Sequence, residues 1–194
     1  MKTLTYIIIL ALNLFATHVV AQGTVWVEDE AHSSIKFSAI HMGISEVEGN
    51  FKDFDIKVVS NEADFTDAKI EVTIQANSLD TDNTKRDDHL KSDDFLGVEK
   101  YPVIKFTSES LTKISDGKYQ LTGTLTIRDV TKTETFDVSH MGTVEAMGET
   151  RAGFKLTGSI QRFDYNVDWN KTFTKGMVVS KEIDIVCNFE LNKK

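Results

Sequence analysis

The segment YQLTGTLTI, residues 119–127, decides the fold class of this chain. An apolar residue or a glycine occupies every second position, and a glutamine or a threonine occupies each position between them. In a β-strand, this period of two turns all the apolar side chains to one face and all the polar ones to the other. Such strands are typical of antiparallel sheets, because strands inside parallel sheets are apolar on both faces.

The same alternation recurs through the chain. Strong examples cover residues 68–76, 151–161 and 183–191, and weaker ones cover residues 34–39, 45–59, 103–110 and 135–140. The turn residues Asp116-Gly117 and Met147-Gly148 favour tight hairpins between such segments. Strands of this kind must bury their apolar faces in a two-sheet sandwich or a closed barrel. Their length favours the barrel, so we predict an all-β, antiparallel barrel of about eight strands.

Residues 84–95 interrupt the strand pattern. The segment is highly charged, and only two of its twelve residues are apolar. We predict a short helix or an ordered loop here that crosses between two strands. Asp82 or Asn83 is suited to cap the first turn of such a helix, because a short polar side chain can accept a hydrogen bond from a free backbone N–H.

Two glycines on the apolar faces, Gly123 and Gly158, have two interpretations that the sequence leaves open. Each glycine can mark a bend or a bulge that relieves strain in a barrel. Alternatively, the missing side chains leave room for a cavity inside the barrel. The two interpretations differ in whether neighbouring side chains or an empty cavity occupy the space beside the glycine, on the inner face of the strand.

The first 21 residues have the layout of a secretory signal peptide. Lys2 supplies a positive start, residues 6–15 are apolar but too few to span a bilayer, and a small-residue cleavage site ends at Ala21. We therefore expect cleavage near Ala21, a periplasmic or secreted location, and one domain over residues 22–194.

Charge and cysteine content narrow the partners and the chemistry. The formal net charge is −8, and removal of the leader makes it one unit more negative because Lys2 is lost. An acidic protein repels phosphate backbones, so we expect no nucleic-acid partner. The single cysteine, Cys187, cannot form an internal disulfide and falls on the apolar side of its strand, which favours an inert buried thiol.

The sequence carries no recognisable catalytic or metal-binding signature. The histidines after the leader, His32, His41, His89 and His140, form no HExxH motif, and the chain has no CxxC motif or GxSxG elbow. A repeated His-Met-Gly tripeptide at His41 and His140 suggests either paired metal ligands or, as we favour, two strand ends that meet turn glycines. We predict no metal, no cofactor and no enzymatic activity.

Three cations gather in the otherwise acidic segment 84–95. Arg86, His89 and Lys91 are suited to receive a polar or anionic ligand headgroup at the opening of a barrel. The alternative is structural, with Arg86 and Lys91 paired to neighbouring aspartates and His89 packed locally. Both interpretations remain open at this point.

Several short motifs follow one another in a specific order after residue 22. They are Trp26 with His32-Ser33-x-Ile35-x-Phe37, Gly49-x-Phe51-x-x-Phe54, Arg86-Asp87-Asp88-His89-Leu90-Lys91-Ser92-Asp93-Asp94-Phe95, Tyr101-Pro102-x-Ile104-x-Phe106 and Ile160-x-Arg162-x-Asp164-Tyr165. This order resembles the YceI-like (polyisoprenoid-binding) family. The resemblance implies a lipocalin-like β-barrel, exported to the bacterial periplasm, with an elongated apolar lumen for polyisoprenoids or similar amphiphiles such as isoprenoid quinones.

We therefore hypothesise a periplasmic carrier that holds one long-chain isoprenoid or similar lipid and touches the membrane only transiently. The predicted lumen residues are Phe37, Phe51, Ile70, Val72, Ile74, Phe106, Leu121, Leu125, Phe154 and Leu156. The predicted headgroup residues are Arg86 and His89. Two alternatives stay open, a solid barrel that acts through its surface and an enzyme that uses His89 or His41, and so does a homodimer.

Overall fold

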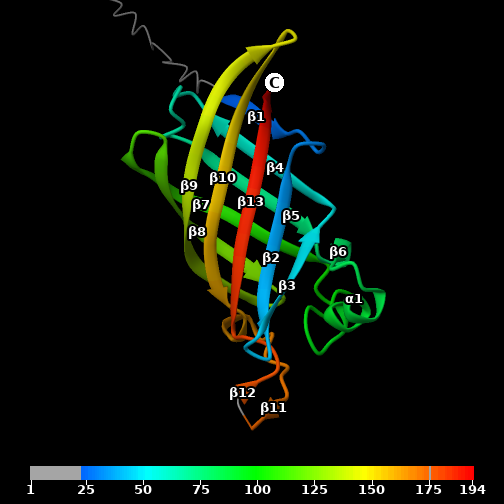
Figure 1. Cartoon of the computed structure of the whole chain (residues 1–194). Coiled ribbons are helices and arrows are strands. Elements are labelled where there is room, and N and C mark those ends of the chain that lie inside the picture. Colours follow the sequence, from blue (N-terminus) through cyan, green and yellow to red (C-terminus); the bar gives the residue numbers. More distant parts are fainter. Residues whose placement is uncertain (1–22, 175) are drawn as a thin grey trace, which may run out of the picture.

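Long antiparallel strands wrap around a common interior in the computed structural model, which describes residues 23–174 and 176–194 (Figure 1). The predicted leader lies outside the described residues. The strands are β1 (Thr24–Glu28), β2 (Ser34–His41), β3 (Ser45–Phe51), β4 (Phe54–Ser60), β5 (Lys69–Gln75), β6 (Leu79–Asp80), β7 (Val103–Ser115), β8 (Lys118–Ile127), β9 (Val130–Ala146), β10 (Glu149–Gln161), β11 (Thr172–Phe173), β12 (Gly176–Met177) and β13 (Glu182–Lys193). The helices are α1 (Thr84–Lys91) and two short 3-10 helices, Ala76–Ser78 and Arg162–Tyr165.

The strands form a closed barrel of eight positions, as the sequence predicts. Three positions are each built from two consecutive strands: β1 with β2, β3 with β4, and β5 with β6. The last strand, β13, pairs with β10 along one edge. Along its other edge it pairs with β2 through residues 184–188 and with β1 through residues 191–193, which closes the ring.

Some predicted elements differ in their extent from the observed ones. The predicted strand over residues 45–59 is interrupted at Lys52 and Asp53, where the chain bends between β3 and β4. The short strand β1 was not predicted. The predicted helix is present, but it ends at Lys91, and Asn83 rather than Asp82 caps it by accepting a hydrogen bond of 3.0 Å from the Arg86 N–H.

The two ends of the barrel differ in their connections. At the end that we call the mouth lie the β2–β3 turn, the connection through α1, the β8–β9 turn, and residues 162–174 and 176–181. At the opposite end, which we call the floor, lie residues 61–68 between β4 and β5 and the β7–β8 and β9–β10 turns. Figure 1 shows α1, β11 and β12 at the mouth and the C-terminus near the floor.

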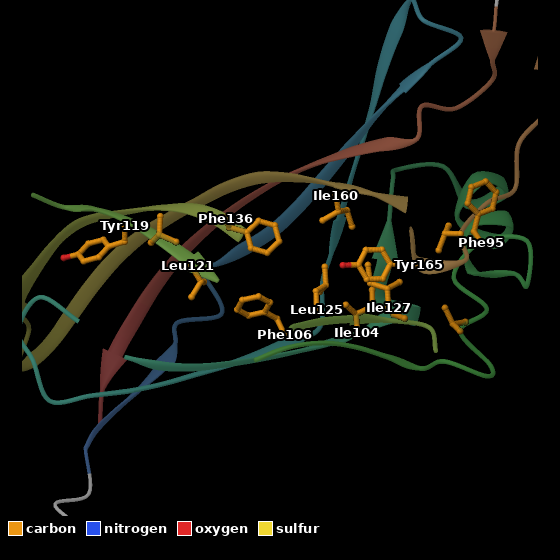
Figure 2. Packing of buried hydrophobic residues seen from close by; sticks show 14 residues of the cluster. Phe95, Ile104, Phe106, Tyr119, Leu121, Leu125, Ile127, Phe136, Ile160 and Tyr165 are labelled. Carbon is orange, nitrogen blue, oxygen red and sulfur yellow. The ribbon is translucent and has the colours of Figure 1, made fainter. Parts of the chain in front are cut away.

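Rings of neighbouring phenylalanines cover the two glycines on the inner face. A methyl group on Gly158 would lie 2.7 Å from the Phe136 ring, and one on Gly123 would lie 2.6 Å from the Phe106 ring. Beside Gly123, the β7–β8 register also shifts between Ser108 and Ser110. Figure 2 shows Phe106 and Phe136 projecting into the interior. Both glycines therefore allow close packing, and the cavity interpretation of these positions is wrong.

In the part of the chain that is described, no helix combines the length and the hydropathy needed to cross a membrane.

We expect Gly158→Ala to lower the free energy of unfolding by about 1–3 kcal/mol, because its new methyl group would collide with the buried Phe136 ring. Gly153→Ala is the matched control in the same strand, since a methyl group there would make only an ordinary contact of 3.4 Å with Met141. Urea denaturation measures both. Equal stability of the two variants would contradict the close packing over Gly158.

Candidate functional site

The barrel encloses a cavity of about 440 Å³. This volume falls within the range of about 300–1,000 Å³ that is typical of small-molecule sites. All ten predicted lumen residues line it: Phe37, Phe51, Ile70, Val72, Ile74, Phe106, Leu121, Leu125, Phe154 and Leu156. The interior is therefore not packed solid by its own side chains.

The wall of the cavity is apolar and holds no carboxylate side chain among the described residues. Its charged or imidazole members are Lys36, His41, Arg86, His89 and Arg162. All except Lys36 belong to the mouth, where the β2–β3 turn, α1 and the connection after β10 meet. Basic groups thus gather at one end of an apolar tube in a chain whose net charge is −8.

Arg86 reaches the cavity from the first turn of α1. Its Nε donates to the Thr81 hydroxyl at 2.7 Å, and its Nη2 donates to the Thr81 carbonyl at 2.6 Å. The Thr81 hydroxyl in turn donates to the buried Asp87 carboxylate at 2.5 Å. The structural alternative, in which Arg86 pairs with a neighbouring aspartate, is therefore wrong for this residue. Among the described residues no acceptor is paired with the Arg86 Nη1.

His89 lies where the cavity meets solvent. Its side chain is 42% exposed, and its Nε2 is 2.9 Å from the Asp94 carboxylate. The imidazole stands edge-on to the rings of Phe95 and Trp169, at centroid distances of 5.0 and 4.8 Å. The predicted local packing of His89 is confirmed, and the same residue also lines the cavity.

Arg162 is the residue of this site that sequence reasoning missed. It is only 4% exposed, and its guanidinium donates to the carbonyls of Val167, Trp169, Val179 and Ser180 at 2.7–3.2 Å. These bonds tie the connection over residues 162–181 across the mouth. Burial lowers the pKa of the Arg162 guanidinium. The sequence contained one signal for Arg162. Positions 158 and 160 face inward, so the alternation places the next inward position at residue 162, which is an arginine.

Tyr165 and Cys187 are two further polar residues of the wall. The Tyr165 hydroxyl donates to the Glu134 carboxylate at 2.7 Å, and burial raises the pKa of this fully buried phenol. Burial also raises the pKa of the Cys187 thiol to about 12, so the thiol stays protonated at neutral pH. The predicted burial of Cys187 is confirmed.

The repeated His-Met-Gly tripeptides do not form a pair of metal ligands. His41 lies at the mouth, where it bridges to Val179. His140 lies at the floor, where its imidazole stacks on the Phe154 ring, and burial lowers its pKa. The two imidazoles thus occupy opposite ends of the barrel.

One group of potential ligands, Asp29, His32 and Glu190, converges on the barrel wall among the described residues. The Arg151 guanidinium already lies between its two carboxylates, 3.3 Å from Asp29 and 2.8 Å from Glu190. The Arg151 guanidinium therefore supplies the positive charge beside these two carboxylates that a metal ion would otherwise supply.

We expect Arg162→Lys to lower the free energy of unfolding by about 2–4 kcal/mol, because an ammonium cannot reach all the carbonyls and leaves buried acceptors unpaired. Hydrogen exchange should accelerate in residues 163–181. Lys132→Met is the control, since its ion pair with Asp164 at 3.3 Å is largely exposed and contributes little. Unchanged stability and exchange in Arg162→Lys would refute the anchoring role.

Comparison with known proteins matches this geometry to one family. The YceI-like domain model matches residues 26–191. A UPF0312 protein of Staphylococcus aureus strain N315 is 35% identical over 167 residues, which cover 84% of this chain and 95% of the relative. The Campylobacter jejuni YCEI protein superimposes with a TM-score of 0.71 at 36% identity, covering 80% of this chain and 90% of the other.

Two more distant solved structures share the fold. Burkholderia cenocepacia BcnA superimposes with a TM-score of 0.73 at 24% identity and covers 84% of this chain and 98% of its own. A polyisoprenoid binding domain of Saccharophagus degradans superimposes with a TM-score of 0.66 at 13% identity and covers 89% and 100%. At these identities the likeness concerns the architecture alone.

Proposed function

This chain belongs to the YceI-like domain family, and from that premise we propose that it binds one long-chain amphiphile of the isoprenoid type inside its barrel. The observation that carries the proposal is an apolar cavity whose basic groups are concentrated at one end. Such a cavity matches a ligand with a long apolar tail and a polar or anionic head. The polyisoprenoid binding of the Saccharophagus degradans domain, which shares the fold, supports the same ligand class.

The apolar wall supplies the affinity in this proposal. Each buried methylene group contributes about 0.8 kcal/mol, so a chain of many carbons is held without any polar contact. Apolar contacts distinguish ligands of similar girth poorly, because a single methylene changes the binding free energy little. Selection among lipids therefore falls to the headgroup end.

Arg86 and His89 are our candidates for the headgroup contact. Both line the cavity at the mouth, and the Arg86 Nη1 is paired with no acceptor in the part of the chain that the structure describes. A guanidinium favours phosphate or carboxylate oxygens, because its charge strengthens the hydrogen bonds that it donates. An anionic head is thus favoured over a neutral one such as a quinone.

We propose binding and carriage rather than turnover. The wall offers few groups for chemistry, since Arg162 donates to backbone carbonyls, Tyr165 to Glu134, and Cys187 keeps its proton. We further propose that the protein is exported to the periplasm after cleavage near Ala21 and contacts membranes only to exchange lipid. Cell fractionation with N-terminal sequencing of the mature protein tests this location.

We expect Leu125→Trp to fold but to lose its lipid, because the larger side chain takes up space within the cavity. Native mass spectrometry of the purified protein, followed by lipid extraction, measures the bound fraction. Thr124→Trp is the matched control, since this neighbouring residue of β8 lies on the opposite face of the strand. Recovery of wild-type protein without lipid, and without uptake of a fluorescent prenyl probe, would count against binding.

We expect Arg86→Gln to raise the Kd for geranylgeranyl phosphate by about 10–100-fold, the effect of losing one charged hydrogen bond. The Kd for geranylgeraniol, which has the same tail without the phosphate, should change much less. Lys85→Gln removes the same charge from an exposed neighbour outside the cavity wall and should leave both values unchanged. An equal loss for the phosphate and the alcohol in Arg86→Gln would rule out a headgroup role.

A further inference from the structure

Four aromatic rings close the barrel at its floor. The Phe65 ring lies 5.0 Å from the rings of Trp26 and Phe154 and 5.3 Å from that of His140. His140 stacks on Phe154 at 4.8 Å. Phe65 and Phe154 line the cavity, whereas Trp26 and His140 do not. The cavity therefore ends against Phe65 and Phe154, with the other two rings behind them.

Phe65 is held in an unusual conformation. It is only 2% exposed, and its φ of 60° is in the left-handed region that a bulky side chain adopts only where its surroundings enforce it. Its N–H donates to the Glu62 carbonyl at 3.0 Å, and its carbonyl accepts from the Ala68 N–H at 2.9 Å. The preceding carbonyl, of Asp64, accepts from the Tyr119 hydroxyl at 2.8 Å. The backbone is thus fixed on both sides of the ring.

The rest of the connection at residues 61–68 is tied down as firmly. The Asp67 carboxylate accepts from the Ser60 hydroxyl at 2.5 Å and from the Asn61 N–H at 2.9 Å. The Asp64 carboxylate lies 3.2 Å from the Lys113 ammonium of β7. The backbone that carries Phe65 is therefore anchored to β4 through Ser60, to β7 through Lys113 and to β8 through Tyr119.

We propose that Phe65 sets the length of the longest apolar chain that the cavity accepts. This inference rests on the proposed binding of a long-chain amphiphile with its head at the mouth. Each methylene that enters the cavity should improve the affinity about fourfold. Once the tail reaches the Phe65 ring, further methylenes find no apolar surface to contact. A plot of log Kd against chain length should therefore show a break.

Isothermal titration of a series of n-alkyl phosphates of increasing chain length locates this break. In Phe65→Gly the break should move to longer chains, because glycine removes the ring and adopts a positive φ freely. For chains just longer than the wild-type break, the variant should bind about fourfold more tightly for each added methylene. Phe65→Leu, which keeps the floor apolar, should move the break in the same direction by less.

Phe106→Ala is the matched control, because it removes a phenyl ring from the side wall of the same cavity. It widens the cavity without deepening it, so the break should stay at the wild-type length. Thermal unfolding checks that each variant is folded. If Phe65→Gly does not fold, Phe65→Leu provides the test.

The outcomes separate this inference from the function on which it rests. Binding by Phe65→Gly and Phe65→Leu with the break at the wild-type length would overturn the role of Phe65 and leave the proposed function standing. A break that moves equally in Phe106→Ala would also overturn it. Failure of the wild-type protein to bind any alkyl or prenyl phosphate would overturn the proposed function as well.

Discussion

The pairing of β13 with both β1 and β2 is the constraint on which the rest of the structure depends. It joins the last strand of the chain to the first, and so converts a curved sheet into a tube with no free edge between the barrel strands. A closed ladder of backbone hydrogen bonds fixes the diameter of the tube. The wall therefore cannot collapse onto the unfilled interior, as a loosely packed core would tend to do.

The tube has a different physical character at each end. At the floor, apolar and aromatic side chains pack closely around Trp26 and Phe65. At the mouth, the buried Arg162 guanidinium is tolerated because four backbone carbonyls accept its hydrogen bonds. This division lets one molecule combine a dry interior with a charged opening. It also orients any amphiphile, because a charged head is costly to bury at the floor.

Much of this architecture could be predicted from the sequence, because a barrel wall is governed by a local rule. An alternation of period two identifies which residues of β5, β8 and β10 face inward, and most of those residues line the cavity. The strand β1 was missed because its five residues are too short a window for that pattern. Phe65 was missed because it belongs to a connection, and its role depends on Trp26 and Phe154, which are remote from it in sequence. Arg162 was recognised only as part of a motif, since its partners lie in an irregular segment without periodicity.

The closed floor has a kinetic consequence for exchange. If the proposed amphiphile binds with its head at the mouth, a second molecule has no path by which to push the first one out from the floor. In the proposed binding mode, an occupant withdraws head first before its successor enters tail first, so exchange passes through an empty barrel. The rate of exchange is then set by the departure of the first molecule, whatever the concentration of the incoming one.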